Sequence, residues 1–147
     1  MSNFKHRIVI FVCYYGTFPW YFKYFLHSCK FNPSVDFIIF TDIPCKEELP
    51  DNVSVEIKSL NDIRTLVSEK LGYAVNIDTP YKLCDYKPVL GLIFNHYASG
   101  YDFWGQCDID IILGDLRSFM DEGFLNAYDF VSCRDTWATG LFFSVQK

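Results

Sequence analysis

The sequence lacks most of the short signatures that would assign a function directly. Its 147 residues contain neither G-x-G-x-x-G nor G-x-x-x-x-G-K, so a dinucleotide site and a P-loop have no support. The G-x-S-x-G pattern of a nucleophile elbow is also missing. The six cysteines are at least sixteen residues apart and form no C-x-x-C pair, which removes the usual spacings of zinc and dithiol sites.

Long apolar runs and an excess of positive charge are missing as well. No stretch of eighteen apolar residues occurs, so we expect no transmembrane segment. The first seven residues are polar and have no secretory character, which favours a cytoplasmic protein with reduced, buried cysteines. Thirteen basic against eighteen acidic residues give a net charge of −5. This balance disfavours nucleic-acid binding and electrostatic adsorption to anionic lipid.

What is present is the composition of one globular domain over residues 1–147, with 50% hydrophobic and 19% aromatic residues. Short apolar runs predict strands, which we expect at 8–13, 35–40, 53–57, 103–107, 128–133 and 140–145. The segment 111–113 continues the apolar run of the fourth strand. Alternation of strands with helices predicts an α/β fold with a mainly parallel sheet and helices on both faces.

Amphipathic stripes and capping residues predict the helices between these strands. Pro19 suits a first helical turn, and an apolar stripe follows it up to Asn32-Pro33. Ser59 opens a capping box, and Gly72 ends that second helix. We expect a third helix from about 87 to 98 and a helical turn at 116–120. The apolar stripe of the first helix consists of Phe22, Phe25, Leu26 and Cys29.

The most informative segment is Cys107-Asp108-Ile109-Asp110, where two acids flank one isoleucine after an apolar strand. In an extended chain residues i and i+2 point to the same side, so we expect both carboxylates to project together. Two close carboxylates repel each other unless a cation lies beside them. Mg²⁺ or Mn²⁺ takes one or two carboxylates and completes its shell with phosphate oxygens and water. The pattern therefore favours a metal–diphosphate site, although D-x-D also occurs by chance at strand ends.

This segment, with the Gly114-Asp115-Leu116 that follows it, resembles the D-x-D block of GT-A glycosyltransferases. The stretches 81–94 and 100–105 resemble a bacterial family of uncharacterised glycosyltransferase-like proteins. The resemblance extends from the first strand to about Arg134 and is most specific between Tyr81 and Leu116. It implies a Rossmann-like GT-A fold, a single domain that binds a nucleotide-diphosphate sugar, and Mn²⁺ or Mg²⁺ as cofactor.

The resemblance also implies roles for single residues. Asp110 would be the more direct metal ligand, and Asp108 would contact the donor ribose or share the metal. The remaining donor-binding candidates lie at the ends of the first two strands and before the third helix. They are Cys13, Tyr14 and Tyr15 at the base, Asp42 at the base or ribose, and Lys82 and Lys87 near the diphosphate. Each of the tyrosines is equally consistent with packing, and each of the lysines with a solvated surface.

The implied reaction moves a sugar from a nucleotide diphosphate, most simply a UDP-sugar, to a hydroxyl of a glycan or lipid-linked acceptor. An inverting enzyme needs a carboxylate base near that hydroxyl, for which Asp129 and Asp135 are the candidates. Related proteins commonly have a further metal ligand, often His, downstream of the D-x-D. All three histidines lie upstream of it here, and Leu141 stands where a polar residue is expected. We therefore expect a domain without the C-terminal acceptor part, for which donor binding is a safer prediction than turnover.

Two other functions remain open. A phosphohydrolase would use Asp108 as nucleophile and Asp110 as acid and base, but Ile112 stands where such enzymes carry a hydroxyl residue. A degenerate relative would bind the nucleotide sugar, or a partner, without catalysis. The aromatic residues between Phe18 and Phe25 are more simply core than surface. If exposed, they would favour a homodimer or a peripheral location at the inner face of the membrane.

Overall fold

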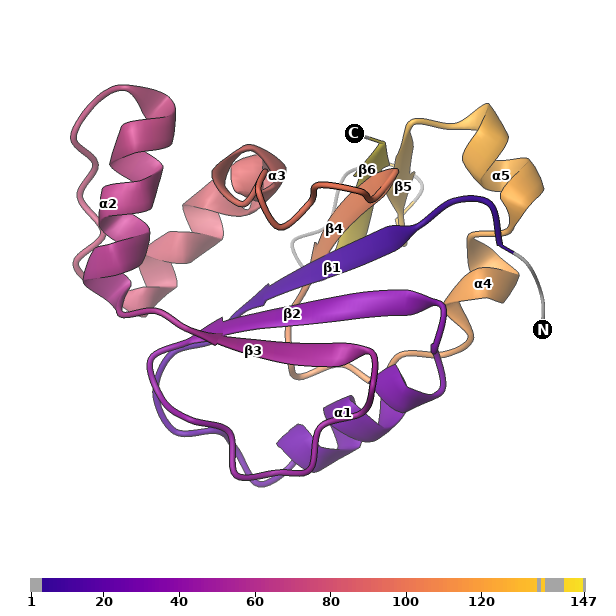
Figure 1. Ribbon diagram of the computed structural model, residues 1–147, viewed down its shortest axis with the longest axis horizontal. Coiled ribbons are helices and arrows are strands. Elements are labelled where there is room, and N and C mark those ends of the chain that lie inside the picture. Colours follow the sequence, from indigo (N-terminus) through magenta and orange to yellow (C-terminus); the bar gives the residue numbers. More distant parts are fainter. Residues whose placement is uncertain (1–3, 135, 137–141, 147) are drawn as a thin grey trace.

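The six strands of the protein form one sheet in the order β3-β2-β1-β4-β6-β5 (Figure 1). The structure is a computed structural model that describes residues 4–134, 136 and 142–146. In chain order the elements are β1 (Ile8–Cys13), α1 (Phe22–Lys30), β2 (Val35–Thr41), β3 (Val53–Ile57), α2 (Leu60–Leu71), the 3₁₀ helix η1 (Pro80–Val89), α3 (Leu90–Ile93), β4 (Phe103–Cys107), α4 (Leu116–Phe119), α5 (Glu122–Ala127), β5 (Phe130–Ser132) and β6 (Phe142–Gln146).

The sheet is mixed. Strands β3, β2, β1 and β4 are parallel neighbours, as the alternation of strands and helices predicts. Strand β6 runs antiparallel to both β4 and β5, so the expectation of a mainly parallel sheet holds only for one side of it. The α/β class is confirmed.

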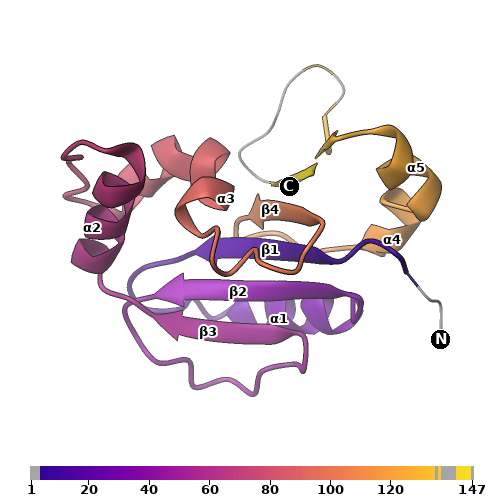
Figure 2. The same ribbon diagram turned by 45° about the horizontal axis from the view of Figure 1, so that its top comes forward.

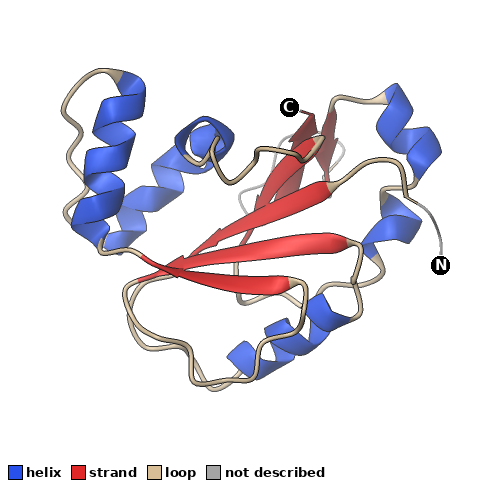
Figure 3. Ribbon diagram, viewed as in Figure 1, coloured by secondary structure: helices blue, strands red, loops and turns tan. Residues whose placement is uncertain are grey.

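Helices cover both faces of the sheet, because the buried strands are apolar on both sides. Side chains alternate along β1, so that Ile8, Ile10 and Val12 face α1 while Val9 and Phe11 face the opposite layer. Figure 2 shows α1 on one side of the sheet and α2 and α3 on the other. In Figure 3 the same two layers of helices enclose the strands.

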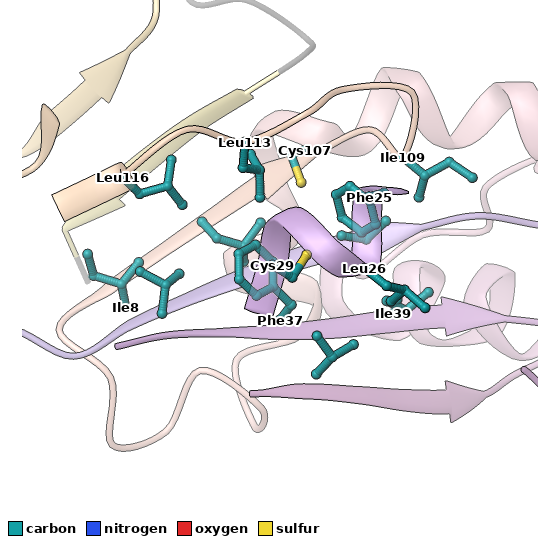
Figure 4. Close-up of a cluster of buried hydrophobic side chains, with 14 of the residues drawn as sticks. Ile8, Phe25, Leu26, Cys29, Phe37, Ile39, Cys107, Ile109, Leu113 and Leu116 are labelled. Atoms are coloured by element: carbon teal, nitrogen blue, oxygen red, sulfur yellow. The ribbon is translucent and has the colours of Figure 1, made fainter. Parts of the chain in front are cut away.

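The core on the α1 face also takes in the chain that follows β4. The expected stripe of α1 is buried, from Phe22 to Cys29. Figure 4 shows Ile109, Leu113 and Leu116 alongside Phe25 and Cys29 of this helix. The segment after β4 therefore turns back over the α1 face and packs there. It forms no strand at 111–113, contrary to the expectation from its apolar run.

The core on the opposite face is aromatic. Phe40 and Phe94 are stacked with ring centroids 3.8 Å apart, and Phe11 lies edge-on to Phe94. Gly91 of α3 passes so close to Trp104 of β4 that a Cβ at this position would meet the indole ring at 2.1 Å. Only glycine therefore allows α3 to approach the sheet this closely.

The second helix is confirmed and the third is corrected. α2 begins with the Ser59–Asp62 capping box and ends at Gly72, whose φ of 77° is left-handed. The helix expected at 87–98 instead begins as η1 at Pro80 and is α-helical only over Leu90–Ile93. Pro88 lies inside η1, where its missing N–H is incompatible with a regular α-helical ladder.

Two more expectations are corrected, one about the length of β5 and one about the burial of the cysteines. The strand expected at 128–133 is shorter, and Phe130 is exposed because β5 is an edge strand. The helix α5, capped by the Asp121 side chain, is too short to have left a periodic pattern. Cys84 and Cys133 are exposed, so the expectation of buried cysteines is wrong for these two, although all six are free.

Candidate functional site

The polar residues that we expected to act together follow the carboxyl ends of β1, β2 and β4. The chain passes from β1 to β2 and β3 on one side, whereas β4 lies on the other side of β1. The crevice beyond the carboxyl ends at such a reversal is where open α/β sheets bind ligands. Cys13 ends β1, Asp42 directly follows β2 and Asp108 directly follows β4, so all three lie at this edge of the sheet.

Lys87 and Asp108 form the central contact at this edge. The Nζ of Lys87 donates to Oδ1 of Asp108 at 2.6 Å, and the two side chains are 18% and 34% exposed. The last turn of η1 carries Lys87 and brings it to the end of β4. A fixed cation therefore already neutralises the first acid of the D-x-D, and sequence reasoning had placed both residues near the same diphosphate.

Asp110 has a different environment. It is exposed, while Ile109 between the two acids is buried in the α1 core. Strand β4 ends at Cys107, and Ile109 and Asp110 form a bend, so the i, i+2 rule for extended chains does not apply. Within the part of the chain that the structure describes, no group bonds to the Asp110 carboxylate. This acid is the one open to a cation or a substrate.

The Cys13 side chain is near the charged groups of Lys87 and Asp108 but is itself neutral. Burial raises the pKa of its thiol to about 12, with Lys87 lowering it and Asp108 raising it. Such a thiol is neither a nucleophile nor a thiolate ligand near pH 7. Cys13 is therefore a buried, neutral side chain near the Lys87–Asp108 pair.

The two tyrosines after β1 lie on opposite sides of the chain. Tyr14 stacks on Phe18 at 5.5 Å, and its hydroxyl donates to the Thr17 carbonyl. Tyr15 packs into the core of the other face. Its hydroxyl oxygen is buried and has no hydrogen-bond partner among the described residues. Burial raises the pKa of Tyr15, and the neighbouring Asp42 raises it further, so this hydroxyl stays protonated near pH 7.

Two donor-binding candidates remain, Asp42 and Lys82, and only Asp42 lies at the carboxyl ends of the strands. Asp42 accepts a hydrogen bond from the Gly16 backbone at 2.9 Å, which ties the loop after β1 to the end of β2. Lys82 pairs with Asp85 at 2.9 Å on the exposed surface of η1. The structure therefore brings Asp42 to the strand ends but does not bring Lys82 to Asp108.

Asp129, one of the two candidate bases, is not brought to this edge. Asp129 precedes β5, and its carbonyl accepts from Gln146, the residue paired with Phe103 at the start of β4. Asp108 follows the other end of β4, a strand of five residues, which separates the two levels by about 15 Å. Asp135 lies outside the described residues.

The Gly114-Asp115-Leu116 block has a structural role that sequence reasoning did not identify. The Asp115 carboxylate accepts from the backbone of Arg117 and Ser118 and caps α4. The buried Asn32 side chain donates to the Gly114 carbonyl at 2.9 Å and accepts from the Leu116 amide at 2.8 Å. Asn32 thus fixes the far end of the segment that begins at Asp108. The only sequence signal was an asparagine directly after α1, which we had taken as a helix end.

The aromatic stretch divides between core and surface. Phe22 and Phe25 are buried, which confirms the core interpretation for them, whereas Trp20 and Tyr24 are exposed. Tyr21 and Tyr24 line a groove that α1 forms with the segment 109–115. Asp110 lies in the wall of this groove. No residue pattern indicated that α1 and Asp110 would border the same groove.

With this geometry in view, the protein can be compared with known families. A family model matches residues 10–138, from β1 past β5 and over the whole D-x-D block. The chain belongs to this family of unknown function, DUF6625. No curated protein matches the chain. Membership in this family implies no activity, so the residues at the strand ends are the guide to function.

Those residues set limits on a metal centre. Among the described residues, no group of three or more His, Cys, Asp and Glu side chains is arranged to hold a metal ion. The DUF6625 member therefore offers Asp110, with Asp108 beside it, and a bound cation would take its other ligands from water and substrate phosphates, as Mg²⁺ commonly does.

No helix of the described chain is both long and apolar enough to cross a bilayer.

Proposed function

We propose that the chain is a nucleotide-sugar-binding domain of GT-A type that acts in metal-dependent glycosyl transfer. The observation that carries the proposal is the pairing at the end of β4. There a lysine-neutralised acid, Asp108, stands two residues from an open acid, Asp110, at the reversal point of the sheet. A diphosphate with its cation matches this combination of fixed positive charge and one free carboxylate.

The donor set is compatible with Mn²⁺ or Mg²⁺. Asp110 would hold the ion, because its carboxylate is exposed and unbonded in the described chain. Asp108 would reach the ribose or the ion only with the part of its carboxylate that Lys87 leaves accessible. A bound cation supplies charge neutralisation for a departing diphosphate.

The residues of the chain itself would bind and orient the donor. The orphaned Tyr15 hydroxyl and the Asp42 carboxylate suit the base and ribose at the ends of β1 and β2. The Lys87 ammonium adds fixed positive charge at the diphosphate, where negative charge develops. In the transfer an acceptor hydroxyl oxygen bonds to the anomeric carbon, the bond from that carbon to the diphosphate breaks, and the hydroxyl proton passes to a base. We do not assign Asp129 as this base, because it lies at the opposite edge of the sheet from Asp108.

Calorimetry with UDP in the presence and absence of Mn²⁺ tests this proposal. UDP should bind with Mn²⁺ and lose at least tenfold in affinity with EDTA. Asp110→Ala should lose the metal-dependent part of the affinity while its unfolding curve stays unchanged, because the side chain is exposed and makes no internal bond. Asp51→Ala is the matched control, an exposed acid in the turn before β3, and should bind as the wild type does.

Undiminished UDP binding by Asp110→Ala, or binding that EDTA leaves intact, would refute the metal site.

A second candidate is a domain that binds the donor without transfer. The Lys87–Asp108 pair favours it, since Lys87 neutralises this acid without any cation. Incubation with UDP-sugars and chromatography of the products separates the two, because only a transferase releases UDP in the presence of an acceptor. Phosphate release from simple esters would instead indicate a phosphohydrolase.

A further inference from the structure

We infer that the groove between α1 and the segment 109–115 binds the apolar tail of an uncharged acceptor whose hydroxyl-bearing head lies beside Asp110. This inference rests on the proposed glycosyl transfer and names the class of its acceptor. The groove encloses about 950 Å³, which is the upper range of pockets for small molecules.

The walls of the groove are apolar and in contact with water. Tyr24, Phe31 and Ile112 all line it and are exposed, and the Ile112 residue is 70% accessible. The Ser28 hydroxyl in the wall already donates to the Phe25 carbonyl at 2.7 Å. An apolar tail would remove these side chains from water without breaking the Ser28 hydrogen bond.

The groove has a direction that joins it to the proposed donor site. The N-terminal end of α1, with Tyr21, lies at the carboxyl edge of the sheet, and Asp110 lines the groove on the opposite wall. From there the groove follows α1 to Phe31 and Gly114. α1 has nine residues, so the length available to a tail is about 13 Å. A molecule lying in the groove would therefore present its head to Asp110.

The charges along the groove choose among amphiphiles. Among the residues that the structure describes, its lining includes two acids and one histidine but no lysine or arginine. The Asp115 carboxylate is engaged at the cap of α4, which leaves Asp110 as the acid that meets a head group. A negatively charged head would be repelled there, because Asp110 and a donor diphosphate together carry more negative charge than one divalent cation neutralises. The occupant that fits is a neutral sugar or alcohol with an alkyl chain, and a concave groove suits such a molecule better than a second copy of the chain.

The experiment uses n-decyl β-D-glucoside below its micelle concentration, with methyl β-D-glucoside as the ligand without a tail. Calorimetry on the full chain should give at least tenfold tighter binding of the decyl compound. Ile112→Glu should weaken this binding at least tenfold by adding charge to the wall. Ile57→Glu is the matched control, an isoleucine 55% exposed at the end of β3 and outside the groove, and should bind as the wild type does. Ile112→Ser serves as a second variant and should weaken binding in the same direction.

Three results would overturn the inference. The first is equal loss of binding in the Ile57 and Ile112 variants, which would indicate partition onto any apolar surface. The second is a wild-type dimer in sedimentation that Ile112→Glu converts to monomer, which would assign the groove to a second copy. The third is displacement of the decyl glucoside by UDP with Mn²⁺, which is incompatible with an acceptor next to a donor. If decyl glucoside binds as expected but UDP does not, the groove is supported as an amphiphile site and the glycosyl transfer fails.

Discussion

The two edges of the sheet each contain an ion pair of 2.6 Å, but the pairs differ in what surrounds them. At the amino edge His6 pairs with Glu122, and the buried Arg117 lies 3.8 Å from the same carboxylate. At the carboxyl edge Lys87 pairs with Asp108 next to the open Asp110. The bond length is the same, so it does not distinguish a structural pair from a functional one. The groups that surround each pair make this distinction.

The amino-edge cluster joins parts of the chain that are far apart in sequence. One carboxylate oxygen of Glu122 accepts from the backbone amides of Lys5 and His6. Arg117 donates to the His6 carbonyl at 2.7 Å and to both the carbonyl and the hydroxyl of Ser34. Its guanidinium also lies over the Phe4 ring. This set of bonds ties the start of β1 to α4 and α5, and a ligand would have to break it to enter.

The largest effect should come from Arg117→Met. The Arg117 side chain is only 7% exposed. Its removal leaves the Ser34 and His6 carbonyls without this donor and takes a positive charge away from Glu122. Breaking a buried charge network in this way costs about 3 kcal/mol of unfolding free energy. Urea denaturation measures it. Arg64→Met, at an exposed position of α2, is the control and should change stability by about 0.5 kcal/mol or less. A loss as small in Arg117→Met would mean that the amino-edge cluster is not structural.

A smaller effect on stability is expected from Lys87→Met at the other edge. Asp108 keeps contact with water after the substitution, since its side chain is 34% exposed, so we expect a loss of about 1 kcal/mol. The same variant should weaken UDP binding about tenfold, because the fixed positive charge at the diphosphate is gone. Arg117→Met, measured at a temperature where it remains folded, should not change that affinity. If Lys87→Met destabilises the protein as strongly as Arg117→Met and leaves UDP affinity unchanged, both pairs are structural.

The comparison also explains which parts of the fold the sequence could predict. Strands β1 to β3 and the helices α1 and α2 follow from local patterns, namely apolar runs, an apolar stripe and a capping box. The 3₁₀ helix η1 could not be predicted in this way, because Pro88 is typical of a helix start whereas η1 already begins at Pro80. The antiparallel β6 depends on pairing with β4 across the sheet, for which periodicity carries no signal.

The candidate site was predictable only where it is local. The strand ends could be placed, and with them Cys13, Asp42 and Asp108. The partner of Asp108 is 21 residues away in η1, and no spacing rule links them. The different environments of the two acids coincide with a bend that begins directly after Asp108. The groove beside Asp110 depends on how the segment 109–115 packs on α1, and residue patterns do not determine such packing.

The smallest expected effect is a pH dependence that belongs to the amino edge. Partial burial opposes ionisation of Glu122, but the backbone and side-chain hydrogen bonds from His6 prevail and lower the pKa of its carboxyl group below the usual value. The titratable and charged side chains facing it are His6 and Arg117. A lowered pKa in the folded state means that this carboxylate stabilises the protein fully above the ordinary glutamate pKa of about 4.3. The contribution is lost as the pH falls through the lower, folded-state value.

Urea denaturation of the wild type and Glu122→Gln at a series of pH values between about 6 and 3 measures this contribution. The wild type should lose about 0.5 kcal/mol more than the variant as the pH falls below 4.3, because glutamine does not titrate and the carboxylate is partly exposed. Asp110→Asn is the matched control at the other edge, where no bond within the described chain depends on the carboxylate. Its stability should fall with pH in parallel with that of the wild type. If instead Asp110→Asn flattens the profile and Glu122→Gln does not, the acid-sensitive structural contact lies at the carboxyl edge, and the distinction between the two edges is reversed.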